Sequence, residues 1–287
     1  MNAARDRLIA EALACPPPAP ADCALRSFTL GGSGSPLLLR VPAKGHIHSS
    51  HIRTAHESVS ALAHATREAY HSALQAEYAK LQDAQPWYWD QLWPGGIALA
   101  RRLIEQPELV RGKSTLEFGS GIGLTACAAA RAGASRVVAT DIEPVALAFA
   151  TQSASDNGVA DVLRAVVWDW DEPPPEADVA AFAPYDVVLL PDVMYDDAAV
   201  ERLGVLAPSL VAPGGLLLWA DGTDRPYGNA HSDRLSELLL SAPPPRFELR
   251  SRSELRDGAS AADGGAAPDR PVRLVVAERH SAGLGTP

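Results

Sequence analysis

The sequence predicts an α/β fold in which helices cover both faces of a mostly parallel β-sheet. Five short segments rich in leucine or β-branched residues alternate with helical or loop segments, as parallel strands buried on both faces do. The first segment runs into a turn with three glycines, and the second ends on an acid, Asp141. Two further strand-like segments close the chain with no helix between them, which indicates an antiparallel hairpin.

Each strand of this sheet is predicted from a short apolar run. The five parallel strands are expected at residues 114–118, 136–140, 163–167, 185–190 and 216–220, and the closing hairpin at 246–250 and 272–278. A turn at 211–215 leads into the fifth strand, and a helix is expected at 196–210. The loop 251–271 is rich in glycine, alanine and aspartate, which predicts mobility.

The main domain is expected at residues 85–287, preceded by an extension and cap at 1–84. Within this extension we expect a short helix at 1–14, strands on either side of a turn at 31–35, and a helix at 57–81. Histidines also gather here, at positions 46, 48 and 51. A solvated turn explains them better than a metal site, because no acid or cysteine joins them at ligand spacing.

Bulk properties restrict the classes of function. A chain of 287 residues can bury one substantial core. Its net charge is −10 and it has no basic run, so we expect no nucleic-acid partner. It also has no apolar run of membrane-spanning length and no CxxC pair among its 3 cysteines. We expect a monomer in the cytoplasm, with mitochondria as the alternative in a eukaryotic cell, and no bound metal.

The glycine turn after the first main strand distinguishes between nucleotide ligands. Its glycines, Gly119, Gly121 and Gly123, have the spacing GxGxG, and Glu117 precedes them. A dinucleotide site would need glycine or alanine at position 124, where the chain has Leu124. An acid beside a pyrophosphate is unfavourable, whereas beside an ammonium or a sulfonium it is favourable. The turn therefore favours a cationic ligand over a dinucleotide.

Asp141, at the tip of the second main strand, can accept hydrogen bonds from both hydroxyls of a ribose. The unit of strand, glycine turn, helix, strand and acid resembles motif I of the class I S-adenosylmethionine-dependent methyltransferases. This resemblance implies a Rossmann-like seven-stranded sheet of order 3-2-1-4-5-7-6, with S-adenosyl-L-methionine as methyl donor. It implies that Glu117 faces the methionine end of the donor and Asp141 its ribose. The implied donor-binding residues here are Glu117, Gly119, Ser120, Gly121, Gly123, Asp141 and Ile142.

Four further motifs lie where strand ends or their rim are expected. Together they resemble the small seven-strand protein lysine methyltransferases, above all the electron-transfer-flavoprotein β-subunit lysine methyltransferase group. The motifs are Trp-Tyr-Trp-Asp-Gln-Leu-Trp-Pro-Gly-Gly at 87–96, Asp-Trp at 169–170, Pro-Asp-Val-Met-Tyr at 191–195, and Asp-Gly-Thr-Asp-Arg-Pro at 221–226. The tryptophans at 87 and 89 are explained equally well by hydrophobic packing of the cap onto the sheet and by a role at the predicted site.

The resemblance covers roughly residues 85–279 and contains two departures. Motif I has Glu117-Phe118 where the flavoprotein enzymes more often have Asp-Leu, and the loop after the fifth strand is altered. These departures leave the protein substrate open.

The resemblance also implies aromatic walls around the donor. Trp93 would pack on the methionine moiety and shield the sulfonium from water. Trp170 would cover the adenine edge, with Asp169 accepting a hydrogen bond from the exocyclic amine. Trp168 is the alternative for that position, because side chains alternate along an extended segment.

Two residues after the fourth strand are the predicted catalytic residues. Asp192, also expected at the donor site, would hydrogen-bond a neutral lysine amine and aim its lone pair, and Tyr195 would form a channel wall. The alternative for Asp192 is the N-cap of the helix expected at 196–210, although Asp196 or Asp197 could supply that cap.

The predicted function is therefore methyl transfer to a lysine amine of a protein substrate. A methyltransferase for a small amine or for a protein histidine is the first alternative. A non-catalytic S-adenosylmethionine-binding protein is the second, and a dehydrogenase is disfavoured by Leu124 and by the closing hairpin.

Overall fold

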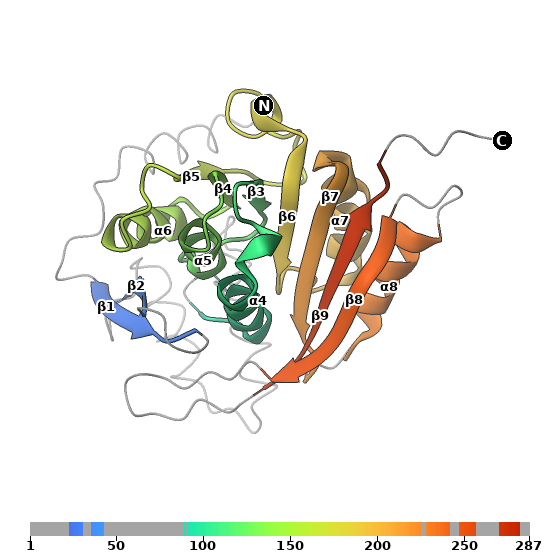
Figure 1. Cartoon of the computed structure of the whole chain (residues 1–287), viewed down its shortest axis with the longest axis horizontal. Helices are drawn as coiled ribbons and strands as arrows, with labels where there is room; N and C mark the ends of the chain where they lie inside the picture. The colour runs from blue at the N-terminus through green and yellow to red at the C-terminus, as the bar shows by residue number, and fades with distance from the viewer. Residues whose placement is uncertain are drawn as a thin grey trace, which may run out of the picture.

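The computed structural model describes residues 23–30, 36–42, 89, 91–224, 228–241, 247–256 and 270–281. Its main feature is a single seven-stranded sheet (Figure 1). The strands are β3 (Ser114–Glu117), β4 (Arg136–Asp141), β5 (Leu163–Val167), β6 (Tyr185–Pro191), β7 (Val211–Gly222), β8 (Phe247–Arg256) and β9 (Pro271–Arg279).

The spatial order of the strands is β5-β4-β3-β6-β7-β9-β8. The pairs from β5 to β7 are parallel, and β9 is antiparallel to both β7 and β8. Numbered within the sheet, this order is 3-2-1-4-5-7-6, so the predicted fold and topology are confirmed. The C-terminal ends of β3, β4 and β6 meet at one edge of the sheet, where ligands bind in open α/β folds.

Two predicted boundaries are wrong. The turn expected at 211–215 belongs to β7, because Val211 pairs with Tyr185 before the register shifts. The closing loop begins later than residue 251, because residues 251–256 of β8 pair with β9. Strand pairing across the chain thus extends both strands into segments that look like loops in the sequence.

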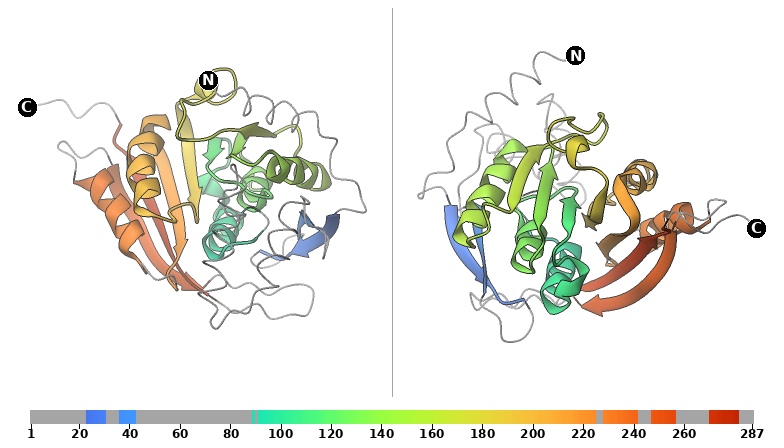
Figure 2. Two further views of the ribbon diagram at one scale, coloured as in Figure 1. Left: turned by 180° about the vertical axis from the view of Figure 1, so that it is seen from behind. Right: turned by 45° about the horizontal axis from the view of Figure 1, so that its top comes forward.

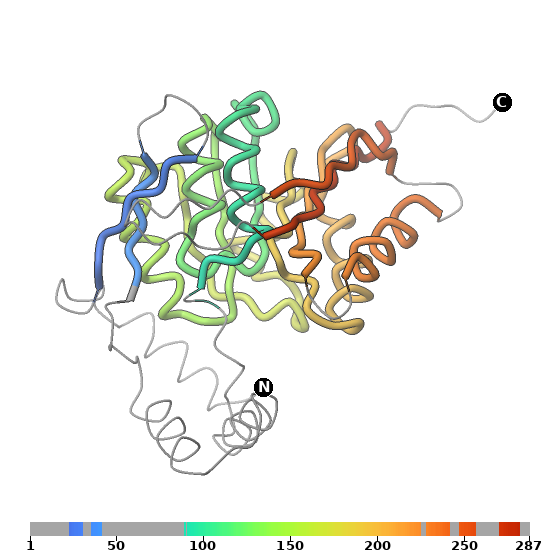
Figure 3. Tube along the Cα trace, turned by 90° about the horizontal axis from the view of Figure 1, so that it is seen from below, coloured from blue at the N-terminus to red at the C-terminus, as the bar shows by residue number. Residues whose placement is uncertain are grey.

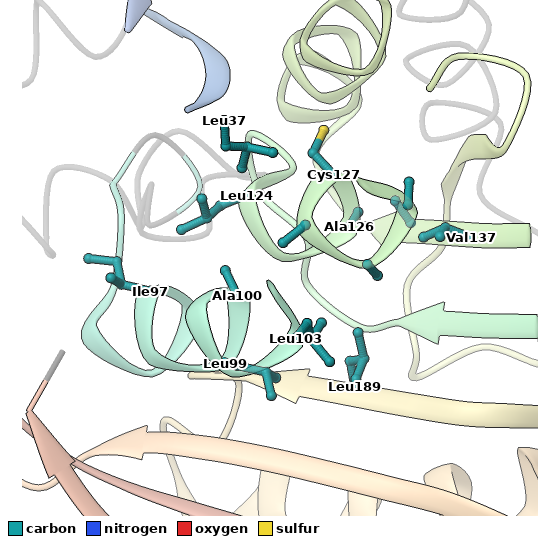
Figure 4. Close-up of a cluster of buried hydrophobic side chains, with 14 of the residues drawn as sticks. Leu37, Ile97, Leu99, Ala100, Leu103, Leu124, Ala126, Cys127, Val137 and Leu189 are labelled. Carbon is teal, nitrogen blue, oxygen red and sulfur yellow. The ribbon is translucent and has the colours of Figure 1, made fainter. Parts of the chain in front are cut away.

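Helices cover both faces of the sheet (Figure 2). One face carries α4 (Pro94–Glu105), α5 (Leu124–Arg131) and α6 (Pro144–Asp156), and the other carries α7 (Asp197–Leu210) and α8 (Ala230–Leu240). Neighbouring strand residues point to opposite faces, since Leu189 packs in the cluster beneath α4 and α5 while Leu190 packs in the cluster beneath α7 and α8. Figure 4 shows Leu99 and Leu103 of α4 near Leu189. Two short 3-10 helices, Pro107–Leu109 and Ala180–Phe182, complete the described elements of the domain.

An antiparallel hairpin from the N-terminal part packs against α6 (Figure 3). It consists of β1 (Cys23–Phe28) and β2 (Leu37–Pro42), as predicted for the strands around the turn. Arg40 forms an ion pair of 2.6 Å with Asp156, and its backbone N–H donates to Ser153 Oγ at 2.9 Å. These contacts attach the hairpin to the main domain.

Other predictions for the N-terminal part fall outside the described residues: the helices at 1–14 and 57–81, and the histidines at 46, 48 and 51. Among the helices that the structure does describe, none is both long and apolar enough to cross a membrane.

Candidate active site

A pocket of about 460 Å³ opens at the sheet edge where β3, β4 and β6 end. Segments far apart in the chain meet there, because parallel strands bring their carboxyl ends together. The predicted site residues in its wall are Trp93, Glu117, Gly119, Ser120, Gly121, Asp141, Ile142, Asp169, Trp170, Asp192 and Tyr195. Gly123 is outside the wall.

The glycine turn is shaped by contacts within the protein. Gly119, Gly121 and Gly123 all have positive φ, the region that favours glycine. A Cβ at Gly121 would lie 2.8 Å from the carbonyl oxygen of Trp89, and one at Gly123 would lie 2.7 Å from Ala150 Cβ on α6. The absence of a side chain at Gly123 therefore lets the start of α5 pack closely against α6, whereas Gly119 and Gly121 line the pocket.

Glu117 is a buried carboxyl in the pocket wall. It is 1% exposed, and its Oε2 has no hydrogen-bond partner among the residues that the structure describes. Burial raises its pKa to about 8, and the charge of Asp141 adds to this, although hydrogen bonds from Thr125 and Ala126 oppose it. At neutral pH the carboxyl therefore holds a proton. A cation placed beside Oε2 would stabilise the charged form instead.

Asp141 connects the end of β4 to the glycine turn. Its Oδ2 accepts from the Gly121 N–H at 2.8 Å, and its Oδ1 accepts from the Glu143 N–H at 2.9 Å. Burial raises the pKa of Asp141, and burial with the Asp141 charge raises the pKa of Glu143 to about 7. This end of the pocket thus concentrates carboxyl groups whose charged forms need a partner.

The segment before α4 forms another wall of the pocket. Trp89 packs its ring 5.8 Å from that of Phe149 and also lines the pocket, so it combines the two roles considered for it. Trp93, the N-cap of α4, lines the pocket. Gln91 and Leu92 line it as well; they belong to the motif at 87–96 but were not among the predicted site residues. The tryptophan at 87 lies outside the described residues.

The tryptophans after β5 differ in burial. Trp168 is 5% exposed within the hydrophobic core, and its Nε1 donates to the carbonyl of Glu172 at 3.1 Å. Trp170 packs only at the edge of that core, and its ring stacks on Tyr195 with centroids 6.1 Å apart and planes at 28°. Both tryptophans line the pocket, and Trp170 is the more exposed of the two.

Asp192 holds three elements together. It has φ 55°, unusual for a residue other than glycine, and it is 8% exposed. Its carboxylate accepts hydrogen bonds from the backbone N–H groups of Gly95, in the first turn of α4, and of Gly222, at the end of β7 (3.1 Å for Gly222). It thereby caps α4, whose own N-cap, Trp93, makes no side-chain cap bond.

The helix after this loop has its own cap. Asp196 Oδ1 accepts from the Ala199 N–H at 2.7 Å at the start of α7, so Asp192 does not cap that helix. The cap on α4 was missed because it joins residues 97 positions apart in the sequence. The sequence did contain one indication that a distant residue caps this helix: the helix start, Trp93-Pro94-Gly95, has no side chain of its own that can act as a cap.

Tyr195 stands at the mouth of the pocket and is 42% exposed. Burial of its hydroxyl and the nearby carboxylates, Asp196 foremost, raise the pKa of the phenol. The phenol therefore stays neutral under ordinary conditions. Within the described part of the chain, no group of three or more acidic, histidine or cysteine side chains is arranged to hold a metal ion.

Comparisons with known proteins agree with this architecture. Residues 82–220 match the model of a family described as lysine methyltransferase. The electron transfer flavoprotein beta subunit lysine methyltransferase of Mus musculus is 34% identical over 149 residues, which are 51% of this chain and 54% of that protein. The human protein of the same name is 37% identical over 123 residues, 40% of this chain and 41% of its own length.

A more distant relative is the protein N-terminal and lysine N-methyltransferase EFM7 of Candida glabrata, 27% identical over 52% of this chain and 60% of that protein. The chain thus spans about half the length of the curated relatives it matches. Among solved structures, PH1948 of Pyrococcus horikoshii, a candidate RNA methyltransferase, aligns over 81% of this chain and 100% of its own. Its TM-score of 0.50 and identity of 12% show a shared fold. Residues 82–220, just under half of the chain, thus resemble the lysine methyltransferase family.

Proposed function

We propose that this protein is an S-adenosylmethionine-dependent methyltransferase that acts on a lysine side chain of another protein. One observation carries the proposal. A single pocket combines a buried carboxyl that favours a cation, Glu117, with a mouth walled by the stacked rings of Trp170 and Tyr195. The match of residues 82–220 to the lysine methyltransferase family model supports the same chemistry.

The residues at the inner end of the pocket fit the methyl donor. Glu117 Oε2 is positioned to accept from an ammonium group, and Asp141 has lone pairs beyond those used by Gly121 and Glu143 with which to accept from ribose hydroxyls. Ile142 is 45% exposed in the pocket wall and offers an apolar surface to a base. When bound, S-adenosylmethionine supplies an electrophilic methyl group on a sulfonium. No metal takes part in this proposal.

The residues at the mouth would prepare the acceptor amine. Lysine attacks only as the neutral amine, and the aromatic surfaces of Trp170 and Tyr195 favour that form by excluding water. The tyrosine ring also offers its face to the positive charge that develops on nitrogen. Asp192 is fixed by Gly95 and Gly222, and its carboxylate lines the pocket where it would orient the N–H groups of the amine.

The proposed acceptor is a lysine on a protein surface. Two relatives are named for methylation of the electron transfer flavoprotein beta subunit, which makes that subunit the first candidate substrate. A net charge of −10 favours a basic partner over a nucleic acid. We propose that the enzyme acts as a monomer in the cytoplasm.

A transfer assay with labelled S-adenosylmethionine tests the proposal. Purified protein is incubated with recombinant electron transfer flavoprotein and, separately, with cell extract, and labelled residues are located by mass spectrometry. Label on a lysine supports the proposal. Label on a histidine or on a small amine favours the first alternative, and donor binding without transfer to any acceptor favours a non-catalytic binding protein.

A further inference from the structure

His231 is a buried residue that contacts the loop carrying the predicted catalytic residues. It lies near the start of α8 and is 6% exposed. Its Nδ1 lies 2.7 Å from the carbonyl oxygen of Met194, the residue before Tyr195. Its Nε2 lies 3.2 Å from Asp197 Oδ1, at the start of α7. One imidazole thus connects α8 to both ends of the segment that contains Tyr195.

The contact with Met194 assigns the hydrogen on Nδ1 of His231. A carbonyl oxygen only accepts, so Nδ1 of His231 carries a hydrogen and donates to Met194. Nε2 lies 3.2 Å from the Asp197 carboxylate. The Asp197 side chain is fully exposed, however, so this contact contributes little to stability. The buried bond to the Met194 carbonyl is the contact that restrains the loop.

This bond completes the restraint of the loop after β6. At its start, the Asp192 carboxylate is held by Gly95 and Gly222. At its end, the Met194 carbonyl is held by His231. The next residue is Tyr195, whose ring stacks on Trp170 at the mouth.

We propose that His231 is a positioning residue that sets the place of Tyr195 in the acceptor wall. The inference rests on the proposed function, because it assigns Tyr195 to the acceptor side of the pocket. His231 is placed to touch neither the donor nor the reacting atoms, since it acts through the carbonyl of Met194.

The neighbouring residue provides a matched control. Ser232 is 1% exposed, and its Oγ accepts from Trp219 Nε1 of β7 at 2.9 Å. It therefore also attaches the start of α8 to the domain through one buried hydrogen bond. Unlike the bond of His231, this bond goes to a strand in the sheet and not to the loop after β6.

The experiment compares the wild type with His231→Phe, His231→Asn and Ser232→Ala. Hydrogen exchange by mass spectrometry follows the peptide that spans residues 192–196. Calorimetry measures S-adenosylhomocysteine binding, and initial rates of methyl transfer are measured against the concentration of recombinant electron transfer flavoprotein beta subunit.

His231→Phe should speed exchange in this peptide and lower kcat/KM for the acceptor, each by at least about tenfold, because the loop loses a buried hydrogen bond. Binding of S-adenosylhomocysteine should stay within about twofold, since the donor end of the pocket is untouched. His231→Asn keeps a donor near the position of Nδ1 and should recover most of the loss. Ser232→Ala should leave exchange in the peptide and kcat/KM near the wild-type values.

Unchanged exchange in His231→Phe would overturn the inference, and so would equal effects of His231→Phe and Ser232→Ala. If asparagine restores nothing, the hydrogen bond to Met194 is not the cause and the inference also fails. If the wild type transfers no methyl group to the flavoprotein subunit, the result contradicts the proposed substrate and not the inference about His231. The exchange data alone then decide whether His231 positions the loop.

Discussion

Glu117 at the inner end of the pocket and Asp192 at its mouth are both buried carboxyl groups, but their oxygens are hydrogen-bonded in different ways. At the inner end, Glu117 has an oxygen without a hydrogen-bond partner in the described structure, and burial raises the pKa of both Glu117 and Asp141. At the mouth, both oxygens of Asp192 accept backbone N–H groups. Glu117 therefore keeps hydrogen-bonding capacity for a ligand, whereas the carboxylate of Asp192 holds the wall of the mouth in place.

This difference follows from where the residues stand in the fold. Glu117 and Asp141 end the adjacent parallel strands β3 and β4, so their side chains meet at the sheet edge. The start of α5 supplies Glu117 with hydrogen bonds from Thr125 and Ala126, but its Oε2 keeps no partner among the described residues. Asp192 lies in a loop that passes between the first turn of α4 and the end of β7. Free backbone N–H groups are available at that point because a helix start leaves them unpaired.

The largest expected effect is at the mouth. Asp192→Asn replaces one carboxylate oxygen by an amide NH₂, which cannot accept from Gly95 or Gly222. We expect the variant to lose about 1–3 kcal/mol of unfolding free energy. We also expect turnover to fall by at least about 10²-fold, the scale for losing a positioned polar group. A labelled-methyl assay and thermal melting measure the two effects.

Asp196→Asn is the matched control, because Asp196 caps α7 and asparagine caps a helix as well as aspartate does. It should be nearly silent in both assays. If Asp192→Asn is equally silent, the mouth does not depend on this carboxylate. The catalytic assignment then moves to Asp221, at the end of β7, or to Asp224 after it.

A smaller effect is expected at the inner end. Asp141→Ala should weaken donor binding by about 1–3 kcal/mol, because charge-assisted hydrogen bonds to the ribose are lost. Calorimetric titration with S-adenosylmethionine measures the change. Asp186→Ala is the control, since Asp186 accepts from the Ser114 N–H at 2.8 Å at the opposite end of the strands. Equal weakening by both variants would show that Asp141 acts on stability alone.

The smallest expected effect is at Tyr195, where two variants distinguish the contribution of the ring to turnover from that of the hydroxyl. Tyr195→Phe keeps the ring that stacks on Trp170, so turnover should stay within about threefold of the wild type. Tyr195→Ala removes the wall and should lower turnover about tenfold. Steady-state rates with saturating donor compare the two variants. A loss of turnover in Tyr195→Phe larger than about threefold would show that the hydroxyl, and not the ring alone, contributes to the reaction.

Local patterns in the sequence were enough to predict the sheet and the position of the pocket. Glu117, Gly119 and Asp141 lie at the ends of strands that short apolar runs predict, and parallel pairing brings those strand ends together. The two bonds of Asp192 and the contact of His231 with Met194 were not predictable in the same way. They join residues on different elements, and no local pattern records which backbone group a distant side chain reaches.

The proton balance of donor binding tests the contrast between the two ends most directly. Burial raises the pKa of Glu117 to about 8, so at pH 7 its carboxyl is protonated before binding. The ammonium group of S-adenosylhomocysteine should lower that pKa and release a proton. Calorimetry at pH 7 in phosphate and in Tris should therefore show a release approaching about one proton for the wild type, and much less for Glu117→Gln. Equal proton counts for the two proteins, or no binding by the wild type, would contradict the account.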